Sequence, residues 1–137
     1  MDMKEFNAQI IEEFRANGGR VAMFADYPMV ILHTIGARSG DTHLIPLVLT
    51  ITDDEQRLLF GSFAGSKTHP AWVHNLRAHG EIDVELASGV MAARVIELEP
   101  EEAARRVEIQ SGISEQFAEY VTSAAPRQIP VFRIDER

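Results

Sequence analysis

The chain has 137 residues, a formal net charge of −8 and no cysteine. The length fits one domain, spanning residues 1–137, with a single core. Without cysteine there are no disulfides, iron–sulfur clusters or thiolate zinc sites, and the negative charge disfavours a nucleic-acid partner. The longest wholly apolar run, residues 28–32, is far below the roughly 20 residues that span a bilayer. With no secretory signal at the N-terminus, we expect a cytoplasmic protein.

The N-terminal residues predict an amphipathic helix that packs on a sheet. Asp2 and Glu5 have the spacing of a capping box, and three apolar residues then recur every four positions: Phe6, Ile10 and Phe14. Asn17-Gly18-Gly19 ends the pattern. A helix lying on a membrane surface is the minor alternative, because the outer face carries glutamates rather than lysines.

The rest of the chain alternates strand patterns with three further helices. Strands are predicted at 29–35, 43–52, 57–62, 82–87, 91–98 and 128–134, and helices at 68–80, 100–110 and 114–124. Thr68 is the expected helix cap, and Pro130 suggests that the last strand lies at a sheet edge or bulge. About six antiparallel strands and four helices indicate a mainly β protein with flanking helices (α+β), built on a small antiparallel barrel.

The turn Gly36-Ala-Arg-Ser-Gly40 has the chemistry of an anion site. Its glycines allow positive φ, which exposes successive backbone N–H groups beside Arg38 and the Ser39 hydroxyl. About half of such turns merely join two strands. The neighbouring basic residues favour the anion site, and they are the only such group in the chain: Arg38, His43, Lys67, His69, His74 and Arg77.

Other catalytic sets are missing from the sequence. It contains no cysteine nucleophile, Gly-x-Ser-x-Gly elbow, His-Glu-x-x-His or Walker loop. The five histidines lack the spacing of a metal triad, and His33 is better explained as a satisfied histidine within a strand. Trp72 is either a core residue or, with Asn75 on the same helix face, part of a binding site. Phe63, Phe117 and Tyr120 are likewise either packing residues or, if they border a cleft, a lid over it.

Several motifs follow one another in a diagnostic order. They are Thr-x-Gly-x-Arg-Ser-Gly at 34–40, Pro-Leu at 46–47, Ser62 in a loop with glycines, His-Pro-x-Trp-x-x-Asn-Leu at 69–76, Phe-x-x-Tyr at 117–120 and Ile-Pro-Val at 129–131. Together they resemble the deazaflavin-dependent nitroreductase family of actinobacteria. That family is the coenzyme F420-dependent branch of the split β-barrel flavin-binding oxidoreductases.

The resemblance implies a split β-barrel that holds reduced F420 and delivers hydride to an electron-poor acceptor, namely a quinone, a nitroaromatic or an α,β-unsaturated carbonyl. It implies no metal. The implied catalytic residues are Ser62 and Tyr120. The Ser62 hydroxyl would polarise the acceptor carbonyl, and either Tyr120 or a water molecule would donate the proton. Phe117 and Tyr120 would border the acceptor. The implied cofactor residues are Ala37, Arg38, Ser39, His43, Leu44, Ile45, Pro46, Leu47, Val48, Ser62, Phe63, Lys67, Ala71, Trp72, His74 and Asn75.

Three departures from the family pattern remove positive charge. The family commonly has Arg at the positions of Ala37 and His43, and Lys at that of Phe63. Each lost charged hydrogen bond weakens anion binding by about 1–3 kcal/mol, which Lys67, Arg38 and Arg77 would offset in part.

Two other functions stay open: the same barrel using FMN or FAD, and a non-catalytic carrier of a deazaflavin or another small molecule. The expected assembly is a monomer or a homodimer formed through the hairpin at 81–98. Any membrane contact would be peripheral, at the inner face of the membrane.

Overall fold

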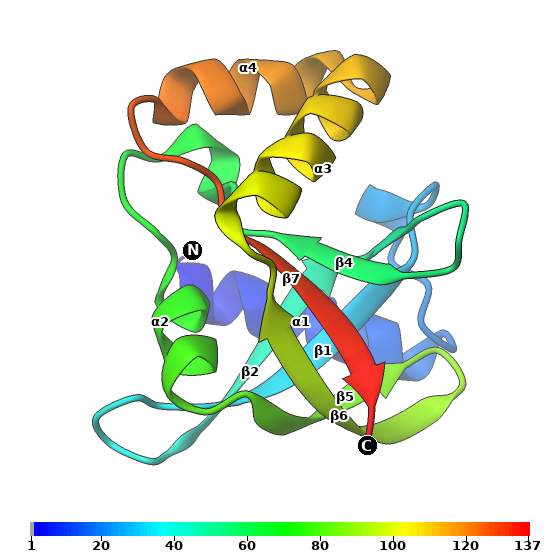
Figure 1. Ribbon diagram of the computed structural model, residues 1–137. Helices are drawn as coiled ribbons and strands as arrows, with labels where there is room; N and C mark the ends of the chain where they lie inside the picture. Colours follow the sequence, from blue (N-terminus) through cyan, green and yellow to red (C-terminus); the bar gives the residue numbers. More distant parts are fainter. Residues whose placement is uncertain (1) are drawn as a thin grey trace.

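The computed structural model describes residues 2–137, which form one antiparallel sheet with helices around it (Figure 1). The strand order is β2-β1-β5-β6-β7-β4-β3. The strands are β1 (Met29–Ile35), β2 (Thr42–Val48), β3 (Thr50–Ile51), β4 (Arg57–Phe60), β5 (Glu81–Leu86), β6 (Gly89–Glu97) and β7 (Val131–Glu136). The helices are α1 (Met3–Ala16), α2 (Ala71–Ala78), α3 (Pro100–Ile113) and α4 (Glu115–Ala124), with short 3-10 turns η1 (Ala22–Phe24) and η2 (Phe63–Gly65).

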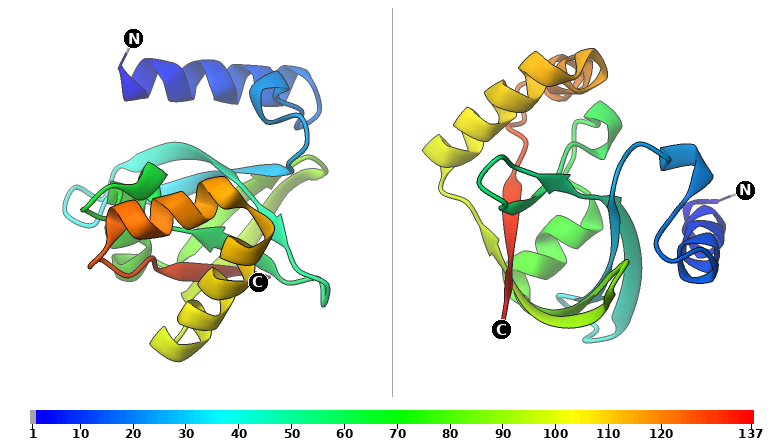
Figure 2. Two further views of the ribbon diagram at one scale, coloured as in Figure 1. Left: turned by 90° about the horizontal axis from the view of Figure 1, so that it is seen from above. Right: turned by 90° about the vertical axis from the view of Figure 1, so that its right-hand side faces the viewer.

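One stretch of chain supplies both edges of the sheet. β2 pairs with β1 at one end of the strand order, and β3 pairs with β4 at the other. Only Leu49 separates β2 from β3, and its side chain is buried in the core. The sheet therefore curls on itself, as the right-hand view of Figure 2 shows. The predicted α+β split barrel is confirmed, and the predicted strand 43–52 is divided in two at Leu49.

Helix α2 fills the interior of the curled sheet (Figure 2). Its three buried residues, Trp72, Val73 and Leu76, join a core cluster with inward-facing strand residues such as Val84 and Phe132. The alternation of buried and exposed residues in β5 places its acidic side chains outside, as predicted. The start of α2 differs from the prediction. Pro70 occupies the N-cap, and the Thr68 hydroxyl instead lies 3.3 Å from Ser66 Oγ.

The other helices cover the outside of the sheet. The predicted cap of α1 is present, since the Asp2 carboxylate accepts a hydrogen bond from the Glu5 N–H at 2.8 Å. α1 packs on the outer face of β1 through a cluster that includes Ile10, Phe14 and Ile31. α3 covers β4 and β7 through a third cluster of buried residues: Leu58, Ala103 and Val131. Within residues 2–137, no helix is both long and apolar enough to cross a membrane.

Of the two positions that Pro130 suggested for the last strand, a sheet edge or a bulge, the edge is wrong. β7 lies between β6 and β4 and pairs with both. Pro130 is compatible with this inner position because it directly precedes Val131, where the strand begins. Its carbonyl accepts a hydrogen bond from the Gly61 N–H at 2.8 Å, so the proline marks the point where β7 meets the loop after β4.

Candidate functional site

The turn between β1 and β2 is stabilised by its own hydrogen bonds. Gly36 N–H donates to the Asp41 carbonyl at 2.8 Å, Gly40 N–H donates to the Gly36 carbonyl at 3.0 Å, and Asp41 N–H donates to Ser39 Oγ at 3.1 Å. Gly40 has φ +75°, a conformation that favours glycine. Because of these hydrogen bonds, fewer backbone N–H groups of the turn are available to an anion than the sequence predicted. Within residues 2–137, only the N–H groups of Arg38 and Ser39 in this turn lack a protein acceptor.

Asn75 joins this turn to α2. Its Oδ1 atom accepts a hydrogen bond from the Ala37 N–H at 3.0 Å, which connects the motif at 34–40 with the motif at 69–76. On the strand side, Thr34 Oγ1 donates to the His43 carbonyl at 2.8 Å. A Cβ added at Gly36 would lie 3.3 Å from His43 Nε2 and 2.4 Å from Ser39 Oγ, so these side chains crowd the start of the turn. Part of the predicted set, Ser39, His43 and Asn75, thus lies at this one turn.

The loop after β4 carries three consecutive residues with positive φ. Phe63, Ala64 and Gly65 have φ values of 46°, 50° and 81°. This conformation is unfavourable for the two non-glycine residues, and such strain concentrates at functional sites. The Phe63 side chain is 44% exposed, and Gly65 lies so close to α4 that an added Cβ would meet Ser123 Cβ at 2.9 Å. The loop therefore presents Phe63 outward while it packs against α4.

Arg127, which the sequence analysis did not single out, holds this loop. Its guanidinium donates to three backbone carbonyls, through Nη1 to Gly61, Nη2 to Ser62 and Nε to Ser66, each at 2.9 Å. Nη1 also lies 2.8 Å from His69 Nδ1. These partners are 58 to 66 residues away in the chain, so no local pattern in the sequence could have indicated them.

The contact with Arg127 determines the protonation of His69. A guanidinium has only donors, so Nδ1 must be the acceptor and the ring proton must lie on Nε2. Burial lowers the pKa of His69 below its ordinary value, and the positive charges of Arg127, Arg77 and His74 lower it further. His69 is therefore a neutral imidazole at physiological pH.

The predicted cofactor residues differ widely in exposure. Several are exposed: Ala37, Arg38, Ser39, His43, Phe63, Lys67, Ala71 and His74. Others are half-buried: Leu44, Ile45, Pro46, Leu47, Val48, Ser62 and Asn75. Trp72 is only 6% exposed and packs in the core, with its ring centroid 5.7 Å from that of Phe132. The structure therefore places Trp72 where it has little surface for a ligand.

The two predicted acceptor residues lie on α4. Phe117 is 8% exposed, and its ring packs edge-on against Phe60 at a centroid distance of 5.1 Å. Tyr120 is half-buried, and its Cα would lie 3.1 Å from a Cβ added at Gly65. The predicted proton donor is thus next to the loop that carries Ser62 and Phe63.

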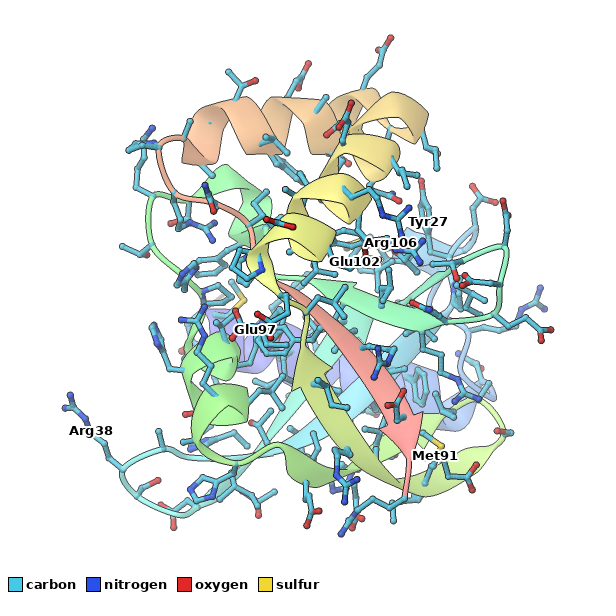
Figure 3. The ribbon with its side chains drawn as sticks, viewed as in Figure 1. Tyr27, Arg38, Met91, Glu97, Glu102 and Arg106 are labelled. Atoms are coloured by element: carbon cyan, nitrogen blue, oxygen red, sulfur yellow. The ribbon has the colours of Figure 1, made fainter. Side chains whose placement is uncertain are left out.

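The predicted group of basic residues is only partly assembled. Arg77 is paired with Glu97 at 2.8 Å, and Lys67 Nζ donates to the Ala125 carbonyl. Arg38 projects away from the body of the protein at the tip of its turn (Figure 3). Arg38 is consequently the cation best placed to meet an anion at this turn.

Two hollows in the surface lie elsewhere. One, of about 760 Å³, is bounded by α3, the end of α4 and residues 125–130, and includes His69 and Arg127. The other, of about 420 Å³, lies between α3 and residues 50–60. Neither is lined by a predicted cofactor or acceptor residue. Neither hollow includes the donors of the β1–β2 turn, which are the Arg38 guanidinium and the N–H groups of Arg38 and Ser39.

Within residues 2–137, no three His, Asp or Glu side chains are grouped so that they could hold a metal ion. His33 is half-buried on β1, and its Nε2 lies 2.7 Å from Glu85 Oε2. It is thus a satisfied strand histidine, as the sequence suggested.

Comparison with known proteins identifies the family. The family model described as F420H2-dependent quinone reductase matches residues 6–136. The chain belongs to the F420H2-dependent quinone reductase family. This confirms the resemblance to F420-dependent reductases, the oxidoreductase class and reduced F420 as the cofactor.

Individual relatives agree with this assignment. F420H2-dependent quinone reductase Rv1261c of Mycobacterium tuberculosis (strain ATCC 25618 / H37Rv) is 26% identical over 129 residues, covering 90% of this chain and 85% of that protein. A solved structure of an F420-H2 dependent reductase (FDR-A) is 29% identical with a TM-score of 0.65, covering 79% of this chain and 94% of the other. A domain-swapped dimer is 26% identical with a TM-score of 0.67, covering 98% and 100%.

Proposed function

We propose that this member of the family uses its β1–β2 turn, β2, the loop at 61–66 and α2 to hold reduced F420 and to reduce a quinone or another electron-poor acceptor. The observation that carries the proposal is the hydrogen bond from Ala37 N–H to Asn75 Oδ1. It fixes the turn with Arg38 at its tip against the helix that the family motif places beside the cofactor.

The residues at the turn fit the anionic part of F420. A phosphodiester needs donors that converge from one side, and the turn offers the Arg38 guanidinium with the outward N–H groups of Arg38 and Ser39. The Ser39 hydroxyl accepts from Asp41 N–H and keeps its own proton to donate. His43 stands beside the turn and adds a positive charge when it is protonated.

The other residues position the reactants, and Tyr120 is also the candidate proton donor. When bound, reduced F420 supplies the hydride, so the protein contributes orientation and a dry contact surface. Phe63, exposed on its strained loop, offers an apolar face. We assign the Ser62 hydroxyl to a hydrogen bond with the acceptor oxygen, and the Tyr120 hydroxyl, or a water near it, to proton donation.

The same proposal covers the remaining properties of the chain. It acts as one split-barrel domain in the cytoplasm, as a monomer or homodimer, and its acceptor reaches it from solution or from the membrane surface. The domain-swapped relative supports the ability of this fold to dimerise. FMN is the weaker cofactor candidate because it lacks the polyglutamate tail, a second anionic group that Arg38 at the tip of the turn could engage.

Parallel titrations with F420 and FMN test the cofactor assignment, with cofactor fluorescence as the signal. The proposal predicts micromolar binding of F420 and much weaker binding of FMN. Tighter binding of FMN would contradict it. Ser62→Ala tests the role of the hydroxyl at the acceptor: turnover at saturating cofactor should fall about fivefold, since one neutral hydrogen bond is worth about 1 kcal/mol. Unchanged turnover would remove Ser62 from the mechanism.

A further inference from the structure

We propose that Arg127 is a positioning residue for the cofactor, which holds the loop at 61–66 in its left-handed conformation and so places Ser62 and Phe63. The inference rests on the proposed function for the cofactor role, while the holding of the loop stands on contacts alone. Arg127 follows α4 and lies outside the turn, strand and helix that the family motifs place around the cofactor.

The contacts of Arg127 are unusual for a half-buried cation. Three of its donors go to carbonyls of one short loop, at Gly61, Ser62 and Ser66. The salt bridges found within residues 2–137 do not include Arg127. Burial lowers its pKa, because no carboxylate offsets the loss of water around the charge. A buried guanidinium with only neutral acceptors adds little to the stability of the fold through its charge. We therefore assign Arg127 the role of fixing the orientation of the loop carbonyls.

The loop needs such a restraint. Positive φ is unfavourable for the non-glycine residues Phe63 and Ala64 and persists only where the surrounding structure enforces it. The carbonyls that Arg127 binds lie on both sides of the strained residues, at Gly61 and Ser62 before them and at Ser66 after them. The guanidinium therefore bridges the two ends of the loop and prevents it from relaxing into an extended conformation.

Neighbouring residues reinforce the same restraint. Ser123 Oγ donates to the Gly65 carbonyl at 2.9 Å, and Lys67 Nζ donates to the Ala125 carbonyl. Arg127 also reaches His69, which directly precedes the start of α2. The segment after α4 thus ties together the loop with Ser62 and Phe63, the beginning of α2 and the helix that carries Tyr120.

The planar fork of arginine is what this site requires. Its Nε, Nη1 and Nη2 atoms donate in fixed directions to three different carbonyls, which a lysine ammonium on a flexible stem cannot reproduce at once. Lysine keeps the charge and loses the geometry, whereas methionine loses both and keeps most of the apolar volume. Arg127→Lys and Arg127→Met therefore separate the effect of the hydrogen-bond geometry from the effect of the positive charge.

The matched control is Arg106→Met. Arg106 lies on α3 (Figure 3), its side chain is only 12% exposed, and it bonds to Glu102 at 3.2 Å and to Gln56 at 3.3 Å. Its replacement also removes hydrogen bonds of a little-exposed arginine, and its partners Glu102 and Gln56 lie outside the loop at 61–66. Both methionine variants should therefore lower the melting temperature, and only one should affect the loop.

The experiment measures hydrogen exchange, F420 binding and steady-state kinetics for the three variants. The amides of Gly65 and Ser66, which donate to Ser62 and Phe63 carbonyls within the loop, report its opening. Arg127→Met and Arg127→Lys should both speed exchange of these amides at least tenfold and raise the KM for F420H2 about tenfold, with the KM for a quinone acceptor changed less. Arg106→Met should leave exchange in the loop and both KM values within twofold.

Three outcomes would overturn the inference. The first is unchanged exchange of the loop amides in Arg127→Met, and the second is an equal increase of that exchange in Arg106→Met. The third is unchanged exchange and KM for F420H2 in Arg127→Lys, which would show that charge alone matters. If the loop opens as expected but the KM for F420H2 does not change, the role in positioning the cofactor is also overturned, and Arg127 only holds the loop. If the unmodified protein binds no F420, the proposed function fails, while the exchange result still decides whether Arg127 holds the loop.

Discussion

Arg38 is the residue on which the proposed anion site depends most. The family commonly carries cations at the positions of Ala37, His43 and Phe63, and this chain keeps none of them as a fixed charge. Of the basic residues near the turn, Arg77 is neutralised by Glu97 and Lys67 is committed to a backbone carbonyl. On the proposed function, Arg38 should therefore carry a larger share of anion binding than one arginine does in a site with several cations.

Removing that guanidinium should weaken F420 binding. Arg38→Ala should lower the affinity at least tenfold, or about 1.4 kcal/mol, because a hydrogen bond to a charged group contributes about 1.5–3 kcal/mol. Isothermal titration at two salt concentrations measures this, and the loss should shrink at high salt because the ions screen the exposed charge. Arg20→Ala is the control, because it removes the same charge at an exposed residue in the segment after α1. Equal affinities of the two variants would exclude Arg38 from the site.

The loop at 61–66 and helix α4 form one packed unit at the level of elements. Gly65 and Gly40 both have left-handed backbones, with φ +81° and +75°. They differ in their surroundings, since an added Cβ at Gly65 would meet Ser123 and Tyr120, whereas nothing lies within 4 Å of one at Gly40. Replacing each glycine with alanine therefore separates the free-energy cost of the clash with α4, which arises only at Gly65, from the cost of the left-handed backbone, which both share.

We expect Gly65→Ala to destabilise the protein by about 1–3 kcal/mol more than Gly40→Ala does, which is the usual cost of overpacking. Urea denaturation of both variants measures the two free energies of unfolding. Gly65→Ala should also lower turnover, because α4 carries Tyr120. Similar unfolding free energies for the two variants would mean that α4 is not packed tightly on the loop.

An ion pair fixes α1 to the sheet. Arg15 on α1 donates twice to the Glu85 carboxylate of β5, at 3.0 and 2.7 Å, and His33 of β1 lies 2.7 Å from the same carboxylate. The Arg15 hydrogen bond is the main reason that the pKa of Glu85 lies below its ordinary value of 4.5, with His33 adding to the effect and burial opposing it. Glu85 is only 12% exposed, so solvent screens the pair less than it would an exposed pair.

Glu85→Gln should therefore destabilise the protein by about 1 kcal/mol at pH 7, a figure reduced because Arg15 is half-exposed. A carboxyl with a lowered folded pKa stabilises the fold above its unfolded pKa and loses that contribution as the pH falls through the folded value. The difference between the two proteins should thus shrink below about pH 4.5. Thermal unfolding from pH 7 to pH 3 measures it, with Glu136→Gln as a control because Glu136 is exposed. A constant difference across this range would contradict the assignment.

For the molecule as a whole, short-range patterns predicted most of the fold. The helix at 3–16 followed from a cap and a four-residue apolar repeat, and the hairpin of β5 and β6 followed from alternation. What the sequence could not predict depends on distant pairing. The break at Leu49 arises because the two halves of one stretch pair with β1 and β4, and the inner position of β7 depends on which strands meet it.

The same division applies to the candidate site. The turn around Arg38 and the helix with Asn75 were predicted from motifs, and the structure adds the hydrogen bond that joins them. The role of Trp72 was left open, and the structure places its side chain in the core. Arg127 was missed because a single arginine in a loop after a helix has no periodicity or spacing to mark it. Only folding brings it to carbonyls at residues 61–66.

Anaerobic mixing of the purified protein with F420H2 and a quinone measures directly whether this molecule catalyses hydride transfer from reduced F420. The fluorescence of oxidised F420 should appear at a rate proportional to protein concentration and far above the rate without protein. Binding of F420 with no acceleration for quinone, nitroaromatic or enone acceptors would contradict the proposed activity and show a carrier rather than an enzyme.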